Sequence, residues 1–525
     1  MERTIPNLLD AAVEEAGSRT WLFHQDSQFT YEEAATCVRA AAGGLAALGV
    51  AHGDRVLVTM ANTPDHLFTW LALMRLGAIL VPANPGSPVP ELIGLLQQTE
   101  PALVVTDPER RAAIGAAVAA GGASPVTVDI GLLFGASADG APPPAARADD
   151  PAVLIPTSGT TGRSKLVTQT HLAYVMAGEG FPWWLDLSAG DRLMTSLPLF
   201  HINAPAYSVL GSVAARASLV LLERFSPRTF IDSARLYGAT QFNSIGAMLE
   251  MLMRLPERSD DGANPLRLCY TGPSPTEERQ LEIERRFGFR IVCGYALSET
   301  PFGLVWRRGS RPFGTLGGVR QHPVLGEVNE ARVMVDGRPA AAGQPGELEL
   351  RNPAVMKGYW RMPEETAAVL GPDGWLRTGD VVTDNEDGTY TFVGRLKEII
   401  RRRGENLAPG EVEEVLASHP DVVEAAVVGV PDELSDEEVK AFVVLGDGSA
   451  SGAAALHAWA SERLARFKVP RYVEFVEELP HTPTGRVAKH ELRRDRTAAE
   501  WDALAGDTAG GTTTGGTDGG TEGHG

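Results

Sequence analysis

Cysteine is scarce in this chain, which has 3 cysteines among 525 residues. Cys37, Cys269 and Cys293 lie far apart, and none of their spacings matches the paired cysteines of zinc sites or dithiol redox motifs. The sequence therefore gives no sign of a cysteine-based metal or redox centre. Such sparse usage is typical of a protein in a reducing cytoplasm, and we expect a cytoplasmic location.

An excess of basic residues and a long apolar run are also missing. Asp and Glu total 67 against 47 Lys and Arg, for a formal net charge of -20. A net negative charge repels phosphate backbones and anionic lipid surfaces, so we expect no nucleic-acid partner. The most apolar stretch, residues 67–82, contains Arg75 and is too short to cross a bilayer, so we expect no integral membrane association. The first ten residues lack the basic region and apolar run of a secretory signal.

The chain does contain the pattern of an α/β protein. Residues 56–58 form a short apolar run, residues 64–76 are helix-like, and residues 78–81 and 102–106 are again apolar. Short apolar strands alternating with helices predict a parallel sheet buried on both faces. Alternating runs separated by Gly and Pro between residues 326 and 350 predict a small antiparallel sheet. We therefore expect a large α/β N-terminal domain of parallel-rich sheets with helices plus a small antiparallel sheet.

A second compact pattern begins after Arg395. Val412, Val415 and Leu416 have helical spacing, and two apolar runs downstream predict strands. This segment predicts a small α+β C-terminal domain, followed by a Gly/Thr-rich tail with almost nothing to bury. The predicted segments are an N-terminal domain over 1–394, a joint over 395–398, a C-terminal domain over 399–497 and a disordered tail over 502–525.

The most informative local pattern is Thr157-Ser158-Gly159-Thr160-Thr161-Gly162-Arg163-Ser164-Lys165, which follows the apolar strand 153–155. Glycines let the backbone approach an anion, hydroxyls and amides donate to phosphate oxygens, and Lys165 supplies positive charge. The spacing differs from the Walker pattern, because Ser164 stands five residues after Gly159. An ordinary Gly/Ser/Thr loop explains such a run equally well when it stands alone.

The surrounding motifs decide between these alternatives. The loop resembles the phosphate loop of the adenylate-forming superfamily, which includes acyl-CoA synthetases, adenylation domains of nonribosomal peptide synthetases and beetle luciferases. Further motifs of that superfamily follow in its order, at Pro198–His201, Gly294–Glu299, Trp375–Asp380, Gly394–Glu398 and Pro483–Arg486. The resemblance extends to about residue 492. The strings at 200–204 and 243–248 look most like crotonobetaine or carnitine CoA ligases.

The resemblance implies a site for ATP and Mg²⁺. A carboxylate beside a triphosphate is a natural magnesium ligand, and the resemblance gives this role to Glu299 with Thr160; a solvated surface acid is the alternative. Asp380 would accept hydrogen bonds from the ribose, where a turn aspartate is the alternative. Tyr295 would stack on adenine. The implied cofactor-binding residues are Thr157, Ser158, Gly159, Thr160, Thr161, Gly162, Gly272, Pro273, Ser274, Tyr295, Ser298, Asp380, Phe392, Arg395, Gly404 and Glu405.

The resemblance also implies an acid pocket and a catalytic set. The implied substrate-binding residues are His201, Asn203, Asn243, Ile245, Gly246 and Gly294. The implied catalytic residues are Lys165, His201, Glu299, Arg486 and Lys489. A lone histidine such as His201 more often satisfies core hydrogen bonds. Lys397 would be the hinge about which the C-terminal domain rotates, whereas by itself it indicates only a charged linker.

One position departs from the pattern. Relatives usually carry Thr-Gly-Lys near the C-terminus, and that lysine bridges the incoming carboxylate and the α-phosphate, whereas this chain has Arg486. A planar guanidinium is not equivalent to a compact ammonium. We hypothesise that Arg486 still serves, with Lys489 as a substitute that would share its face if the segment is helical.

The resemblance implies an ATP-dependent carboxylic acid:CoA ligase that acts through an acyl adenylate, releases pyrophosphate and uses Mg²⁺ and coenzyme A. Its partner would be a small-molecule acid, with a homodimer possible. One alternative is an adenylate-forming enzyme with another acceptor or nucleophile: a carrier protein, an amine, or nitrite in diazotisation. The other is a non-catalytic nucleotide-binding protein, against which the retention of Lys165, Glu299, Asp380 and Arg395 argues.

Overall fold

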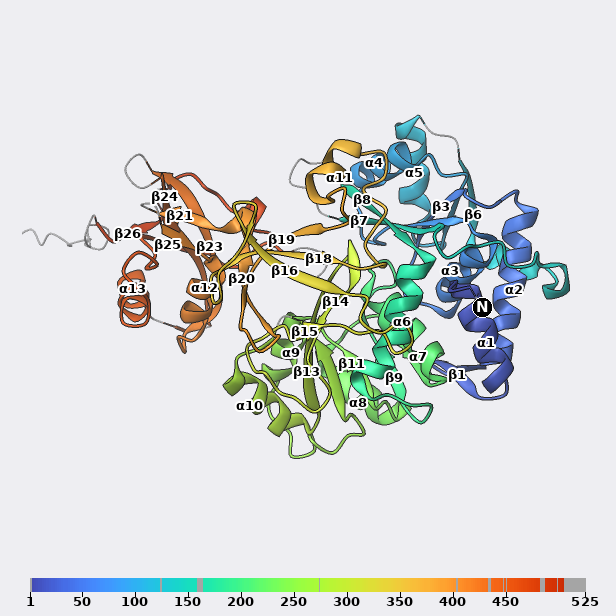
Figure 1. Ribbon diagram of the computed structural model, residues 1–525, viewed down its shortest axis with the longest axis horizontal. Coiled ribbons are helices and arrows are strands. Elements are labelled where there is room, and N and C mark those ends of the chain that lie inside the picture. Colours follow the sequence, from blue (N-terminus) through green and yellow to red (C-terminus); the bar gives the residue numbers. More distant parts are fainter. Residues whose placement is uncertain are drawn as a thin grey trace, which may run out of the picture. The chain divides into compact units, whose positions relative to one another are not determined.

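The protein is described by a computed structural model that divides into two compact units, Met1–Phe392 and Val393–Gly525 (Figure 1). Each unit is described by itself below. The structure describes residues 2–504 apart from 123–124, 158–163, 273, 403–404, 433–435, 447, 450, 482–486 and 498.

A nine-stranded sheet forms the centre of the first unit, in the order β15-β14-β13-β12-β11-β9-β10-β1-β2. Neighbours from β1 to β13 in this order are parallel, so their carboxyl ends open on one edge of the sheet. Strands β11 and β12 are buried along their whole length, as expected of a parallel sheet covered on both faces. The strands are β1 (Thr20–His24), β2 (Ser27–Thr30), β9 (Arg192–Thr195), β10 (Ser218–Leu221), β11 (Gln241–Asn243), β12 (Leu268–Thr271), β13 (Arg290–Leu297), β14 (Thr300–Val305) and β15 (Gly318–Val319).

A second sheet in this unit has six strands in the order β6-β5-β3-β4-β7-β8. It is parallel from β6 to β7 and ends in the antiparallel pair β7–β8. The strands predicted at 56–58, 78–81 and 102–106 are confirmed as β3, β4 and β5. The strands are β3 (Arg55–Thr59), β4 (Ile79–Pro82), β5 (Leu103–Thr106), β6 (Val126–Asp129), β7 (Pro151–Thr157) and β8 (Lys165–Thr170).

Helices cover these sheets, and α1, α2 and α3 pack against one another (Figure 1). The predicted helix over 64–76 is confirmed as α3. The Thr63 hydroxyl caps its first turn, and Gly77, at φ 67°, ends it in the left-handed conformation that glycine tolerates. The helices are α1 (Ile5–Ala16), α2 (Tyr31–Ala47), α3 (Pro64–Leu76), α4 (Val89–Thr99), α5 (Arg111–Gly121), α6 (His171–Leu185), the π-helix η3 (Ala204–Val209), α7 (Leu210–Ala215), α8 (Pro227–Tyr237), α9 (Gly246–Met253), α10 (Glu277–Phe287) and α11 (Pro363–Val369).

One helix is shorter than its sequence suggests. The apolar run from residue 247 predicts a long helix, but α9 has only eight residues and stops before Arg254. The next residues include Pro256 and form the loop 254–266, which leads into β12. Apolar character alone does not extend a helix where proline removes a backbone donor.

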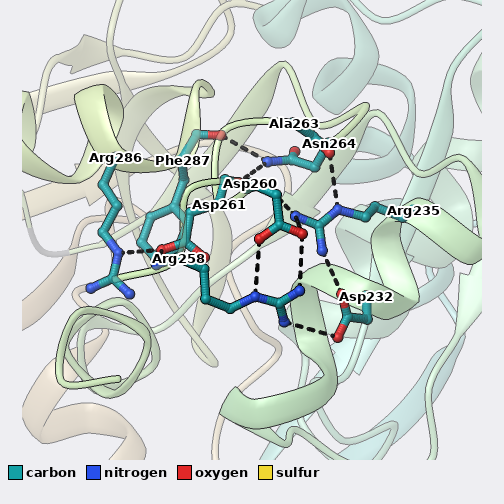
Figure 2. Close-up of polar contacts among 9 residues, drawn as sticks. All are labelled: Asp232, Arg235, Arg258, Asp260, Asp261, Ala263, Asn264, Arg286 and Phe287. Atoms are coloured by element: carbon teal, nitrogen blue, oxygen red, sulfur yellow. Dashed lines mark hydrogen bonds and ion pairs between the residues drawn. The ribbon is translucent and has the colours of Figure 1, made fainter. Parts of the chain in front are cut away.

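Ion pairs hold this loop in place. Figure 2 shows the Arg258 guanidinium between two carboxylates: it donates to Asp260 at 3.0 and 2.9 Å and to Asp232 of α8 at 3.4 Å. Arg286 of α10 donates to Asp261 at 2.8 Å, with both side chains less than a tenth exposed. The loop is thereby tied to the helices on either side of it.

The predicted small antiparallel sheet is confirmed, with five strands in the order β17-β16-β18-β19-β20. The runs predicted near 331–335 and 346–350 are β16 and β18. Strand β19 carries Asp380, and the division between the two units falls within β20. The strands are β16 (Glu330–Val335), β17 (Arg338–Pro339), β18 (Gly346–Arg351), β19 (Leu376–Asp384) and β20 (Tyr390–Arg395).

The second unit contains a six-stranded sheet in the order β22-β21-β24-β25-β26, with β23 paired to β24. Its apolar core includes Val412 and Leu416, two of the residues with the predicted helical spacing. The elements are η4 (Leu396–Glu398), β21 (Ile400–Arg402), β22 (Glu405–Leu407), α12 (Pro409–Ala417), β23 (Val422–Asp432), β24 (Asp436–Leu445), α13 (Ala453–Ser461), β25 (Tyr472–Phe475), the single turn η5 (Lys489–Glu491) and β26 (Trp501–Asp502).

Residue 502, where the predicted tail begins, lies in β26. This short strand pairs with β25, and Arg471 donates to Asp502 at 3.1 Å. The fully buried Lys440 ammonium lies 2.8 Å from the Glu500 carboxylate. Charge pairing therefore extends the ordered chain beyond the point where apolar residues become rare. Residues 505–525 lie outside the described part.

None of the helices in the described part of the chain combines the length and the apolar composition needed to cross a membrane.

Candidate active site

The predicted phosphate loop joins two paired strands. Thr157 at the end of β7 lies opposite Lys165 at the start of β8, and the Thr157 hydroxyl donates to the Lys165 carbonyl at 3.2 Å. The two ends of the loop therefore meet. Residues Ser158, Gly159, Thr160, Thr161 and Gly162 lie outside the described residues.

A segment far along the chain, residues 356–360, lies against β8 and forms a single β-bridge with it. Thr168 N donates to Gly358 O at 2.9 Å, and Trp360 N donates to Leu166 O at 2.8 Å. This pairing places the 356–360 segment against β8, the strand that begins at Lys165.

The same segment contacts the turn between β13 and β14, which carries Ser298 and Glu299. Met356 N donates to Glu299 O at 2.8 Å, and the Gln169 side chain of β8 donates to Ser298 O at 2.7 Å. The backbone that carries both predicted site residues is therefore held by two other segments.

Lys165 and Glu299 meet at a tyrosine that the sequence analysis did not identify. Tyr359 donates its hydroxyl to Glu299 Oε1 at 2.9 Å, and Lys165 Nζ lies 4.7 Å from the centroid of the Tyr359 ring. Burial, with the adjacent Glu299 carboxylate, raises the pKa of Tyr359, so its hydroxyl stays protonated and donates. The only sequence signal was an aromatic pair after a glycine, which is more often a core feature.

The residues around Glu299 fit a magnesium ion held mainly by phosphate oxygens. Within the described residues no ion pair involves the Glu299 carboxylate, and no group of three or more His, Cys, Asp or Glu side chains is arranged to hold a metal. Magnesium at a nucleotide is commonly bound through one or two carboxylates plus phosphates, so a single acid suffices. Thr160, the other predicted ligand, is not among the described residues.

Two of the residues predicted to bind the nucleoside, Tyr295 and Asp380, are hydrogen-bonded to each other. Tyr295 of β13 donates its hydroxyl to Asp380 Oδ2 at 2.6 Å. Asp380 N donates to the Thr378 hydroxyl at 3.1 Å, and Gly379 between them has φ 70°. Asp380 is almost completely buried. A buried carboxylate held at both its side chain and its backbone has one defined orientation.

At two of the predicted glycines, neighbouring atoms leave no space for a side chain. A Cβ on Gly272 would lie 2.4 Å from the Gly294 carbonyl oxygen, and a Cβ on Gly294 would lie 2.6 Å from the Tyr270 hydroxyl. Both positions require glycine for reasons of space. Ser274 donates its hydroxyl to the Pro275 carbonyl at 3.2 Å. Pro273 was not described by the structure.

Two of the predicted acid-pocket residues, Asn203 and Asn243, contact each other. Asn243 at the end of β11 donates to Asn203 Oδ1 at 2.8 Å and accepts from the Gln241 amide at 2.7 Å. Asn203 immediately precedes η3, and the His201 ring lies 4.5 Å from the Phe200 ring, measured between centroids. Beyond Asn243, Ile245 immediately precedes α9 and Gly246 is its first residue.

A buried arginine, Arg320, contacts residues of η3, β12 and β14. Arg320 is completely buried and donates to the Tyr207 hydroxyl at 2.7 Å, to Pro301 O at 2.7 Å and to Leu304 O at 3.0 Å, as well as to the Tyr270 hydroxyl. Among the described residues no carboxylate pairs with it. It connects η3, β12 and β14. The sequence analysis missed it because arginine ordinarily indicates surface.

The remaining predicted residues belong to β20 and the second unit. Phe392 is an exposed residue of β20, and Arg395 is the last residue of that strand. Lys397 lies in η4, and Glu405 begins β22. Gly404 and Arg486 are outside the described residues.

Lys489 is paired within the second unit. Its Nζ lies 2.7 Å from Glu413 Oε1 of α12 and 3.5 Å from Glu398 Oε2 of η4. The segment is a single 3-10 turn, and Lys489 is mostly buried. Two carboxylates therefore hold the residue that we hypothesised as a substitute for the usual lysine.

Comparisons with known proteins identify the class. The AMP-binding enzyme family model matches residues 9–360, and the AMP-binding enzyme C-terminal domain model matches residues 411–486. The crotonobetaine/carnitine–CoA ligase of Salmonella enteritidis PT4 (strain P125109) is 32% identical over 488 residues, which is 89% of this chain and 93% of that protein.

Solved structures show the same fold. ATP-bound MatB from Rhodopseudomonas palustris superposes with a TM-score of 0.85 and 29% identity, covering 93% of this chain and 98% of that one. The O-succinylbenzoate coenzyme A synthetase MenE from Bacillus subtilis, in complex with AMP, gives a TM-score of 0.83 and 26% identity, covering 94% and 98%. The chain belongs to the AMP-binding enzyme family. Within it, the chain is an AMP-forming ligase of the acyl-CoA synthetase type.

Proposed function

We propose that the protein is an ATP-dependent carboxylic acid:CoA ligase. It forms an acyl adenylate with release of pyrophosphate and then transfers the acyl group to the thiol of coenzyme A. The observation that supports this proposal is that Lys165 and Glu299 both contact Tyr359, so that a cation and a carboxylate share one neighbour where the predicted phosphate loop ends.

In the first step, an oxygen of the substrate carboxylate attacks the α-phosphorus of ATP, and the bond from that phosphorus to the bridging oxygen of pyrophosphate breaks. Such chemistry needs alignment and charge neutralisation more than covalent help. Lys165 would neutralise phosphate charge, and Asp380, already oriented by Tyr295, would accept hydrogen bonds from the ribose hydroxyls. Magnesium bound at Glu299 would supply further charge neutralisation on the phosphates.

In the second step, the thiolate of coenzyme A attacks the acyl carbonyl carbon, and AMP leaves. The first step needs a site closed to water, and the second needs an entry path for a thiol. Rotation of the second unit about Lys397 would satisfy both needs in turn. The hinge at 395–398 is a proposal from family resemblance.

Isotope exchange between pyrophosphate and ATP tests the first step. Purified protein is incubated with Mg²⁺, ATP and labelled pyrophosphate in the presence of a panel of aliphatic and aromatic acids. We expect exchange that depends on one class of acid. A protein that binds ATP but exchanges no label with any acid would be a nucleotide-binding protein rather than a ligase.

Mass spectrometry of the products tests the acceptor. We expect an acyl-CoA when coenzyme A is added to ATP and the active acid. An acyl adenylate that accumulates despite coenzyme A, and disappears with an amine or a carrier protein, would replace the ligase proposal by a different acceptor. Exchange that requires nitrite instead of a carboxylic acid would assign the diazotisation chemistry.

A further inference from the structure

We propose that Tyr359 is a positioning residue that couples the magnesium carboxylate Glu299 to the phosphate lysine Lys165. This inference rests on the proposed function, and it deepens the description of the same site. One side chain performs both tasks: its hydroxyl holds the acid, and its ring faces the ammonium.

The backbone of Tyr359 is fixed from both sides. On one side the 356–360 segment pairs with β8, where Val167 lies opposite Tyr359. On the other side Tyr359 N donates to the Thr366 hydroxyl of α11 at 2.9 Å. Gly358 has φ 130°, and a Cβ there would lie 2.7 Å from Thr366 Cγ2, so this approach to the helix requires glycine. The backbone from which the ring projects is therefore held in place.

The hydroxyl contact orients a metal ligand. A carboxylate has two oxygens, and a neutral donor on Oε1 leaves Oε2 available to a cation. Groups that hydrogen-bond to metal ligands typically change metal affinity about 10-fold to 100-fold when they are removed. A phenol hydroxyl is a neutral donor, so Tyr359 holds Glu299 without adding a competing charge.

The ring contact orients the lysine. An ammonium 4.7 Å from the centroid of a tyrosine ring is attracted by the electrons of its face, by about 0.5–2 kcal/mol. This contact restrains Lys165, whose flexible side chain would otherwise occupy many rotamers. The hydroxyl and the ring thus contact different residues, and substitution can remove the hydroxyl alone or both together.

Two variants separate the contributions. Tyr359→Phe keeps the ring and removes the hydroxyl, whereas Tyr359→Leu removes both. For Tyr359→Phe we expect ATP affinity in EDTA to stay within about 2-fold of the parent, while the Mg²⁺ concentration for half-maximal enhancement of ATP binding rises about 10-fold. For Tyr359→Leu we expect the same rise in Mg²⁺ requirement and, in EDTA, an additional loss of ATP affinity of about 2-fold to 5-fold.

Titration calorimetry of the full-length protein with ATP, in EDTA and at a series of Mg²⁺ concentrations, measures both quantities without any acid substrate. The matched control is Tyr237→Phe, which removes a tyrosine hydroxyl that donates to Gln25 O at 3.2 Å in another part of the unit. We expect this control to match the parent in both titrations. Melting temperatures establish that each variant is folded.

A Tyr359→Phe protein with the parental Mg²⁺ requirement would overturn the coupling through Glu299. Equal loss of ATP affinity with and without Mg²⁺ in this variant would also overturn it, because that result indicates general support of the fold. These binding readouts do not require adenylate formation. Failure of the parent protein to activate any acid would therefore refute the ligase proposal without deciding the role of Tyr359.

Discussion

At the scale of single residues, the site depends on side chains that hold other side chains. Asp380 takes its orientation from the Tyr295 hydroxyl and from the turn at Thr378. Glu299 takes its orientation from Tyr359. The motif residues were found from the sequence because their order resembles a family. Tyr359 and Arg320 were not found, because their roles arise from contacts between segments distant in the chain.

For Asp380 we predict a large effect on nucleotide binding. Asp380→Asn removes the charge that strengthens hydrogen bonds to the ribose, and a charge-assisted hydrogen bond contributes about 1.5–3 kcal/mol. ATP affinity measured by calorimetry should fall at least about 10-fold, whereas Tyr295→Phe, which only releases the carboxylate, should cost less. Asp384→Asn on the same strand is the control and should bind ATP normally. Unchanged affinity in Asp380→Asn would remove this residue from the nucleotide site.

For Lys489 we predict a structural effect. Lys489→Met leaves Glu413 without its cation, so the free energy of unfolding should fall by about 1–3 kcal/mol, and Glu413→Gln in the same chain should recover part of the loss. The control is Lys468→Met, which breaks a more exposed pair with Glu411 on the same helix. Denaturant titration measures all of these variants.

The same variants decide the catalytic hypothesis for the C-terminal basic residues. If Arg486 serves in place of the usual lysine, Arg486→Ala should lower pyrophosphate exchange at least about 100-fold, while the Lys489→Met/Glu413→Gln double variant keeps most of it. A folded Lys489→Met protein that loses exchange would identify Lys489 as the substitute. Full exchange in both Arg486→Ala and Lys489→Ala would remove this element from the mechanism.

At the scale of elements, the pattern of apolar residues predicts which segments form strands. The point where a helix ends depends also on contacts that its following loop makes. The strands at β3, β4 and β5 follow from apolar runs, and α3 follows from the helix-like stretch between two of those runs. The length of α9 did not follow from apolar composition, because its end leads into a loop fixed by ion pairs to α8 and α10 (Figure 2). Such long-range pairs leave no periodic signal in a sequence.

The loop 254–266 allows a graded test of these ion pairs. Arg286→Met removes the cation of a pair in which both side chains are less than a tenth exposed, so the free energy of unfolding should fall by about 3 kcal/mol. Arg258→Gln breaks pairs that are about half exposed and screened by solvent, so it should cost clearly less than Arg286→Met. Denaturant titration of both variants checks the order. Equal losses would show that burial does not set the strength of this network.

At the scale of the whole molecule, the chain forms two units, and the sequence pattern indicated both of them through the change in character near residue 395. The fold class was predictable because strand and helix periods persist over hundreds of residues. The mutual placement of Lys165, Tyr359 and Glu299 was not, because it requires three segments to pair in three dimensions. The roles of the hinge and of Arg486 stay predictions.

Stability should depend on pH through buried histidines of the first unit. Burial lowers the pKa of His66 and of His171 from 6.5 to about 4. Between these values the unfolded chain binds protons that the folded chain does not. The free energy of unfolding should therefore fall as the pH drops from 6.5 to 4, by up to about 3 kcal/mol for each histidine, and this contribution levels off below pH 4.

Denaturant titrations between pH 4 and pH 7 measure this dependence in the parent and in His171→Gln, which cannot titrate at that position. The difference in unfolding free energy between the two proteins should shrink or change sign as the pH falls. A constant difference across the range would contradict the assignment for His171. The exposed His490 provides the control, since His490→Gln should follow the parent curve.

The short strand β26 has a consequence for how the protein behaves at high concentration. It pairs with the outer side of β25, and the Arg471–Asp502 and Lys440–Glu500 ion pairs hold it there. An unpaired β-strand presents backbone donors and acceptors to any neighbouring molecule. By returning to its own sheet, the chain covers a stretch of backbone that would otherwise recruit foreign strands and begin aggregation.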